Sequence, residues 1–136
     1  MTIVQEEPMG CGIAAVANIA NLSYATVKAK ANSMGIFAGD ELLYSDTQYV
    51  RNLLKEYGFS ASTDEMPFQS WSLLPDVALL SIKHKIENNR PFWHWVVFKK
   101  SSAGGIVQDS SMQITNHERT DFENMQPKWF IHVSKT

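Results

Sequence analysis

The chain has 136 residues, 44% of them hydrophobic and 19% charged, which predicts one folded domain over residues 1–136 and excludes a disordered chain. Its formal net charge of −2 supplies no basic field for binding nucleic acid. The single cysteine, Cys11, excludes an intramolecular disulfide and a cysteine-based zinc site, and it is compatible with a reducing compartment.

The N-terminal third is apolar but carries no targeting pattern. The first eight residues lack the basic and apolar stretches of a secretory signal. The longest apolar run, Ile13–Ala20, is shorter than the roughly 20 residues that span a bilayer. We therefore expect a cytoplasmic protein without a membrane segment. Residues 10–22 are alanine-rich and apolar on nearly every side, which predicts a short helix buried on most sides, with Gly10 and Gly12 loosening its entry.

Two further helices are expected. Ser23 is a favourable N-cap, and the helix after it should run over Tyr24–Ser33 and end at Gly35. Apolar residues at helical spacing predict another helix over Asp46–Tyr57.

Later segments are rich in β-branched and aromatic residues, which favour strands. Residues 88–91, Asn-Asn-Arg-Pro, form a turn signal. The expected strands are Phe59–Thr63, Val77–Lys85, Phe92–Lys100, Gly105–Gln108 and Trp129–Val133. Helices followed by antiparallel strands predict an α+β fold in which N-terminal helices pack on a C-terminal sheet.

Cys11 stands at the start of the predicted buried helix. A helix N-terminus carries partial positive charge and unpaired amides, which favour a thiolate and can stabilise an oxyanion beside the sulfur. The neighbouring Gly10 and Gly12 leave room for a substrate to approach. The alternative is that Cys11 is simply a small buried apolar residue.

Three other residues complete a possible catalytic set. Gln5, six residues before Cys11, could fold back and supply a second oxyanion donor, or it could be a solvated glutamine. His94 lies in an apolar strand and needs partners for both ring nitrogens, which a thiolate and a carboxylate would provide; backbone carbonyls are the alternative. Asp109, at the end of the next strand, could orient His94 or serve as a turn residue.

Taken in order, these residues resemble the bacteriocin-processing, double-glycine leader peptidase family, a branch of the papain-like cysteine peptidases. The resemblance covers Gln5, the segment 11–15 (Cys-Gly-Ile-Ala-Ala), the strand 94–98 and the segment 107–110, and so spans almost the whole chain. It implies a papain-like fold in which Cys11 is the nucleophile. Gly10 and Ser110 depart from the family, which often has an acidic residue and a proline at these positions.

The set predicts hydrolysis of a peptide or amide bond through a thioester on Cys11, without a metal or cofactor. Gly10, Trp93 and Trp95 are expected to border the substrate, which would be a peptide or protein. Family members often precede a membrane transporter, and no such segment occurs here, so a transporter or secretion partner is left open. The alternatives are a deamidase or transglutaminase-type enzyme acting as a toxin or effector, and a non-catalytic peptide-binding domain.

Overall fold

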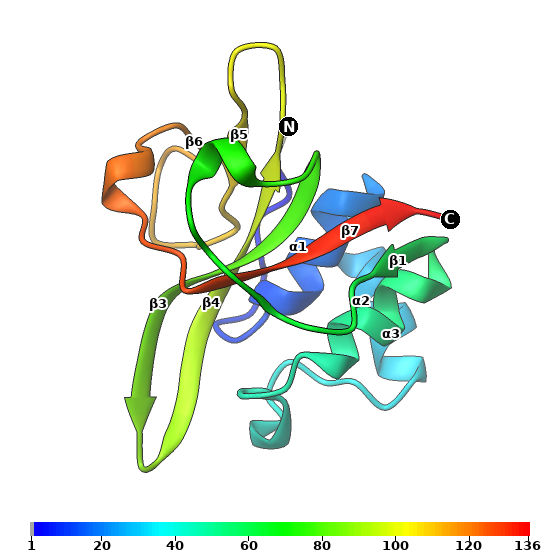
Figure 1. Cartoon of the computed structure of the whole chain (residues 1–136). Helices are drawn as coiled ribbons and strands as arrows, with labels where there is room; N and C mark the ends of the chain where they lie inside the picture. The colour runs from blue at the N-terminus through cyan, green and yellow to red at the C-terminus, as the bar shows by residue number, and fades with distance from the viewer. Residues whose placement is uncertain (1) are drawn as a thin grey trace.

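A computed structural model of the chain, describing residues 2–136, has three α-helices followed by an antiparallel sheet (Figure 1). The helices are α1 (Cys11–Ala20), α2 (Tyr24–Ser33) and α3 (Gln48–Glu56). The strands are β1 (Phe59–Ala61), β2 (Met66–Pro67), β3 (Val77–Glu87), β4 (Arg90–Lys99), β5 (Ile106–Gln108), β6 (Glu118–Arg119) and β7 (Trp129–Lys135). Short 3-10 helices occur at η1 (Glu41–Leu43), η2 (Trp71–Leu73) and η3 (Phe122–Asn124). The predicted α+β class and the order of helices before strands are confirmed.

The sheet is antiparallel throughout, with the strand order β1-β7-β3-β4-β5-β6 and with β2 paired to β7. Its longest elements, β3 and β4, form a hairpin that projects beyond the other strands (Figure 1). Asn88 and Asn89 close it with φ values of 51° and 64°, a conformation that asparagine tolerates and that matches the twist of a hairpin. The register shifts between Ile82, which pairs with His94, and Lys85, so a bulge lies beside His94.

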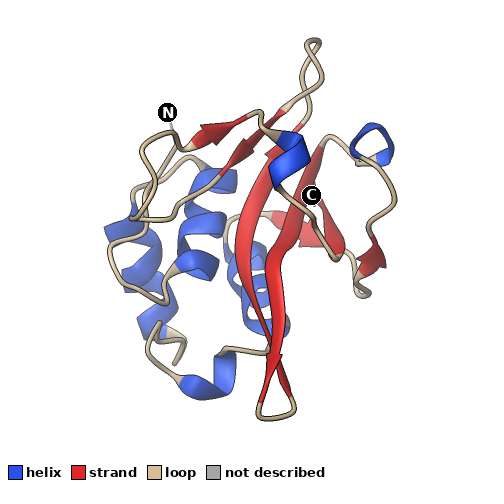
Figure 2. Cartoon of the chain, turned by 90° about the vertical axis from the view of Figure 1, so that its left-hand side faces the viewer, coloured by secondary structure: helices blue, strands red, loops and turns tan. Residues whose placement is uncertain are grey.

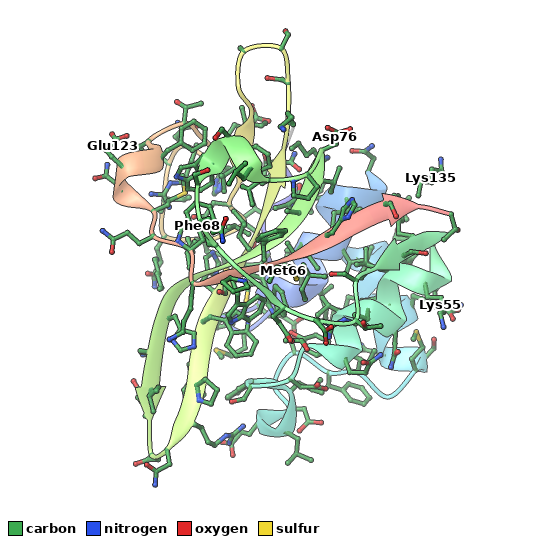
Figure 3. The ribbon with its side chains drawn as sticks, in the orientation of Figure 1. Lys55, Met66, Phe68, Asp76, Glu123 and Lys135 are labelled. Atoms are coloured by element: carbon green, nitrogen blue, oxygen red, sulfur yellow. The ribbon has the colours of Figure 1, made fainter. Side chains whose placement is uncertain are left out.

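Successive side chains of the central strands pack alternately into two hydrophobic cores, one on each face of the sheet. Helices α1, α2 and α3 gather on one side (Figure 2), where Trp95 and Val97 of β4 join their apolar residues. Val96 and Phe98 face the other side. The segment between β1 and β3 crosses that second face (Figure 1), and Figure 3 shows Met66 and Phe68 along it.

Element boundaries differ from the predictions where a side chain or a strand partner decides them. Helix α3 begins at Gln48, because the Asp46 carboxylate accepts a hydrogen bond from the Gln48 amide (2.9 Å) and Asp46 therefore precedes the helix. Strand β4 begins at Arg90, so the predicted four-residue turn is reduced to two residues. The two-residue strands β2 and β6 were not predicted, because two residues are too few to show a hydrophobic period and each strand is defined only by its pairing partner. Within residues 2–136, no helix is both long enough and apolar enough to cross a membrane.

Candidate active site

Cys11 is the first residue of α1 and is partly exposed. The residue before it, Gly10, makes no side-chain cap, and the first turn contains no acidic residue. The N-terminal amides of α1 therefore lie beside the thiol, and no capping or acidic side chain of this turn accepts their hydrogen bonds. Such amides favour a thiolate and can donate to an oxyanion formed at the sulfur.

His94 connects Cys11 to Asp109. Strands β4 and β5 are antiparallel, with Val97 opposite Gln108, so the residue after β5 lies near the middle of β4. The Nε2 atom of His94 lies 2.7 Å from Oδ1 of Asp109, whose side chain is fully buried. The Cys11 side chain lies close enough to the His94 ring to raise the pKa of His94. Because Nε2 is occupied by Asp109, Nδ1 is the ring nitrogen left to exchange a proton with the sulfur.

The charges of this set favour an imidazolium at His94. Burial by itself lowers the pKa of His94, but the hydrogen bonds to Asp109 and Cys11 and their negative charges raise it from 6.5 to about 9. Burial likewise favours the neutral form of Asp109, but its bonds to His94, Ser111 and Arg119 hold the pKa of this carboxyl well below its usual range. The arrangement therefore maintains a carboxylate and an imidazolium at neutral pH.

Gln5 is buried rather than solvated, with 5% of its surface exposed. Its backbone amide donates to the Ser110 carbonyl (3.0 Å), and its side-chain oxygen accepts from the Ser110 hydroxyl (2.9 Å). The side-chain nitrogen donates to the carbonyls of Glu7 and Pro8, both at 3.0 Å. These bonds hold Gln5 against the loop that leads into Cys11, and in this state both amide hydrogens are directed to that loop.

Two tyrosine hydroxyls occupy the space beside the glycines that flank Cys11. We had expected this space to be open to an approaching substrate. A side chain at Gly10 would collide with the hydroxyl of Tyr24, and one at Gly12 with that of Tyr49. Gly10 is buried, which gives it a packing role beneath Tyr24. Burial and the nearby Cys11 raise the pKa of Tyr49 above its ordinary range, so its phenol remains protonated at the site.

We expect Gly10→Ala to destabilise the fold by about 1–3 kcal/mol, because the added methyl group overpacks a filled site. The Tyr24 hydroxyl cannot withdraw freely, since it donates to Glu7 Oε1 at 2.6 Å. Urea unfolding should show the loss, and Tyr24→Phe in the same chain should recover part of it. Gly39→Ala is the matched control, because a methyl group added at Gly39 would have no neighbouring atom within 4 Å. Equal effects of the two alanines would contradict the packing role.

Two adjoining hollows flank the Cys11–His94 pair. A narrow apolar pocket, with about 30 Å³ of space accessible to water, lies beside Cys11. A wider and more open recess, of about 410 Å³ measured in the same way, lies beside His94. The two share Met9, Tyr44 and Trp93. The apolar pocket is further lined by Ile13, Ile36, Phe37, Ala38, Leu43, Tyr49 and Trp95.

The two predicted substrate-bordering tryptophans differ in position. Trp93 is partly exposed and lines both hollows, whereas Trp95 lines only the pocket beside Cys11 and is 3% exposed. Both pack edge-to-face with each other and with Trp129, with ring centroids 5.1–5.6 Å apart. Trp95 therefore belongs largely to the core, and Trp93 carries most of the exposed aromatic surface of this pair.

Two residues of the site were not found from the sequence. Ser110 donates to Gln5, so consecutive residues, Asp109 and Ser110, support His94 and Gln5 respectively. Arg119 of β6 donates to Oδ2 of Asp109 at 3.0 Å. Asp109 also fulfils the expected alternative role of a turn residue, since its Oδ1 accepts from the Ser111 amide at 3.0 Å. Within residues 2–136, no group of three or more potential metal-ligating side chains is gathered.

No protein-family model and no curated protein matches the sequence. Among solved structures, the fold is similar to the crystal structure of a double glycine motif protease from an AMS/PCAT transporter, in complex with the leader peptide. The two superpose with a TM-score of 0.63 and 16% sequence identity, over 100% of this chain and 91% of that chain. The similarity confirms the predicted papain-like arrangement, with helices preceding an antiparallel sheet.

Proposed function

We propose that the chain is a cysteine hydrolase that cleaves a peptide bond through a thioester on Cys11. The observation that carries the proposal is that His94, close to the Cys11 thiol, is hydrogen-bonded to the buried Asp109 carboxylate. A thiol at a helix N-terminus, a histidine close to it and an acid orienting that histidine are the arrangement of an activated nucleophile.

In the proposed reaction, His94 Nδ1 takes the proton of the thiol, and the sulfur attacks the substrate carbonyl carbon. The Cys11 amide and the Gln5 side chain donate to the resulting oxyanion. This role requires Gln5 Nε2 to exchange one of its bonds to the Glu7 and Pro8 carbonyls for a bond to the substrate. Collapse of the tetrahedral intermediate breaks the carbon–nitrogen bond, and His94 gives its proton to the leaving amine. Water, deprotonated by His94, then releases the acid from the thioester.

The pocket beside Cys11 and the recess beside His94 favour an extended peptide with apolar side chains as the substrate. The pocket next to Cys11 is lined mainly by aliphatic and aromatic residues, and Phe37 and Met9 leave about half of their surfaces exposed at 50% and 44%. Apolar pockets with few polar groups bind apolar ligand groups. The similar protease was solved in complex with a leader peptide, which is consistent with a peptide substrate here.

The reaction is tested by incubating the protein with a pool of synthetic peptides that are rich in apolar residues and contain glutamine. Mass spectrometry separates the outcomes. Cleavage yields two shorter peptides, deamidation releases ammonia from an intact peptide, and amine transfer adds the mass of a supplied amine. Cleavage that is absent in Cys11→Ala supports the proposal. Products of deamidation or transfer alone, or cleavage that persists in Cys11→Ala, would overturn it.

For Gln5→Ala, we expect peptide cleavage to fall by about 10²–10³-fold, the cost of removing one oxyanion donor. Alkylation of Cys11 by iodoacetamide forms no oxyanion, so its rate should change much less. Ser110→Ala provides a graded comparison, because it removes the donor to Gln5 Oε1 and leaves Gln5 in place. An equal loss of cleavage and alkylation in Gln5→Ala would assign Gln5 to the support of the Cys11 loop instead.

A further inference from the structure

Arg119 bridges two carboxylates at the far end of the Cys11–His94–Asp109 line. Its Nη1 donates to Asp109 Oδ2 at 3.0 Å, and its Nε and Nη2 form a two-pronged contact with Asp121 at 2.9 and 2.8 Å. The guanidinium is 16% exposed and Asp109 is fully buried, whereas Asp121 lies at the surface with 38% of its side chain exposed. A planar guanidinium with five donors can hold two carboxylates in fixed orientation, which an ammonium group cannot.

With the hydrogen bond from Arg119, the orientation of the Asp109 carboxylate is fixed at both oxygens. Oδ1 receives hydrogen bonds from His94 and from the Ser111 amide, and Oδ2 receives the one from Arg119. Rotation about the Cβ–Cγ bond would break all three bonds. The backbone of Asp109 is also fixed, because its amide donates to the His117 carbonyl and its own carbonyl is bonded to His117 Nδ1, both at 2.8 Å.

We propose that Arg119 is a positioning residue of the catalytic set, which holds Asp109 so that its Oδ1 stays directed at His94. Asp121 anchors the guanidinium and offsets its charge, so Arg119 aligns the carboxylate with little net positive charge added beside the His94 imidazolium. The inference rests on the proposed cysteine hydrolase.

Several other groups surround this cluster and define its electrostatic setting. They are Cys11 from α1, Tyr49 from α3, Lys83 from β3, His94 from β4, His117 from the loop before β6 and Asp121 from the segment after it. Lys83 lines the same hollow as Arg119 and Asp121, but its positive charge lies on an exposed side chain, where solvent screens it. Arg119, unlike Lys83, contacts Asp109 directly, on the oxygen that His94 does not use.

The test measures the rate of Cys11 alkylation by iodoacetamide from pH 5 to pH 9, followed by intact mass, which needs no known substrate. In Arg119→Met we expect alkylation at pH 6 to fall roughly tenfold, and the pH of half-maximal rate to rise by about one unit. Arg119→Lys should recover part of the rate, because lysine restores the charge but cannot bridge both carboxylates. Arg51→Met is the matched control. Arg51 is a similarly buried arginine, 10% exposed, which pairs with Glu65.

The outcomes separate this inference from the proposed function when His94→Ala is measured in parallel. Slow alkylation in His94→Ala and Arg119→Met, with Arg51→Met unchanged, supports both. Slow alkylation in His94→Ala with a wild-type rate and profile in Arg119→Met overturns the role of Arg119 and leaves the proposed function standing. A wild-type rate in His94→Ala overturns both. If Arg119→Met does not fold, the test uses Asp121→Asn, which removes only the charge that anchors Arg119. An alkylation rate about threefold lower at pH 6, equivalent to a shift of roughly half a pH unit in the profile, supports the role of Arg119. A wild-type rate overturns it.

Discussion

His94→Ala is expected to slow the alkylation of Cys11 at pH 6 by about 10- to 100-fold and to lower peptide cleavage by about 10³-fold or more. An isolated thiol is ionised in roughly 0.3% of molecules at pH 6, so rapid alkylation at that pH requires a partner that accepts the proton. The His94 ring lies close to Cys11 and is hydrogen-bonded to Asp109, and the alanine variant removes this side chain. Intact-mass spectrometry with iodoacetamide measures the first effect, and the peptide pool measures the second.

His132→Ala is the matched control for this variant. His132 lies on β7 with an exposed side chain, and its hydrogen bonds in the structure are made by its backbone. Its alanine variant should therefore alkylate at the wild-type rate. If His94→Ala also alkylated at that rate, Cys11 would be an ordinary partly exposed thiol. The binding-domain hypothesis would then be the better account of the fold.

The elements that bring the site together follow patterns that are local in the sequence. An alanine-rich apolar run predicts the helix that Cys11 begins, and Ser23 caps α2 by accepting from the Thr26 amide at 3.1 Å, as expected. The two strands that carry His94 and lead to Asp109 are recognisable from their β-branched and aromatic residues. Antiparallel pairing of these neighbours then places the two side chains together without further information.

The residues that were missed make contacts that no local sequence pattern reveals. Arg119 lies on a two-residue strand that exists only because it pairs with β5, so no hydrophobic period reveals it. Gly10 was interpreted as space for a substrate, because nothing near it in the sequence shows that the Tyr24 hydroxyl occupies that space. Ser110 resembles an ordinary turn residue until Gln5 is placed against it from 105 residues away. Such packing contacts, and hydrogen bonds to the residues that support the site, can be identified only from the tertiary structure.

Asp109→Asn should be far more damaging here than the similar size of the two side chains suggests. Both carboxylate oxygens act as acceptors, Oδ1 for His94 and Ser111 and Oδ2 for Arg119. An amide offers one acceptor and one NH₂ group, so it must direct a donor either at the Arg119 guanidinium or at His94. The first arrangement places donor against donor, and the second holds His94 in the wrong tautomer. We expect peptide cleavage to fall by about 10²–10⁴-fold.

The same variant gives a pH dependence whose sign is fixed by the structure. The pKa of His94 is raised to about 9, against the effect of burial, by its bonds to Asp109 and Cys11. The imidazolium therefore persists through neutral pH. If it protonates the leaving amine as proposed, cleavage should decline as pH rises through about 9. In Asp109→Asn this decline should move to lower pH, because the negative charge that favours the imidazolium is lost. NMR titration of ¹³C-labelled histidine measures the midpoint directly, with the His94 signal assigned by its absence in His94→Ala. A wild-type midpoint at or below about 6.5, the ordinary value, would mean that Asp109 and Cys11 do not outweigh burial, and His94 would then be mostly neutral in the resting enzyme at pH 7.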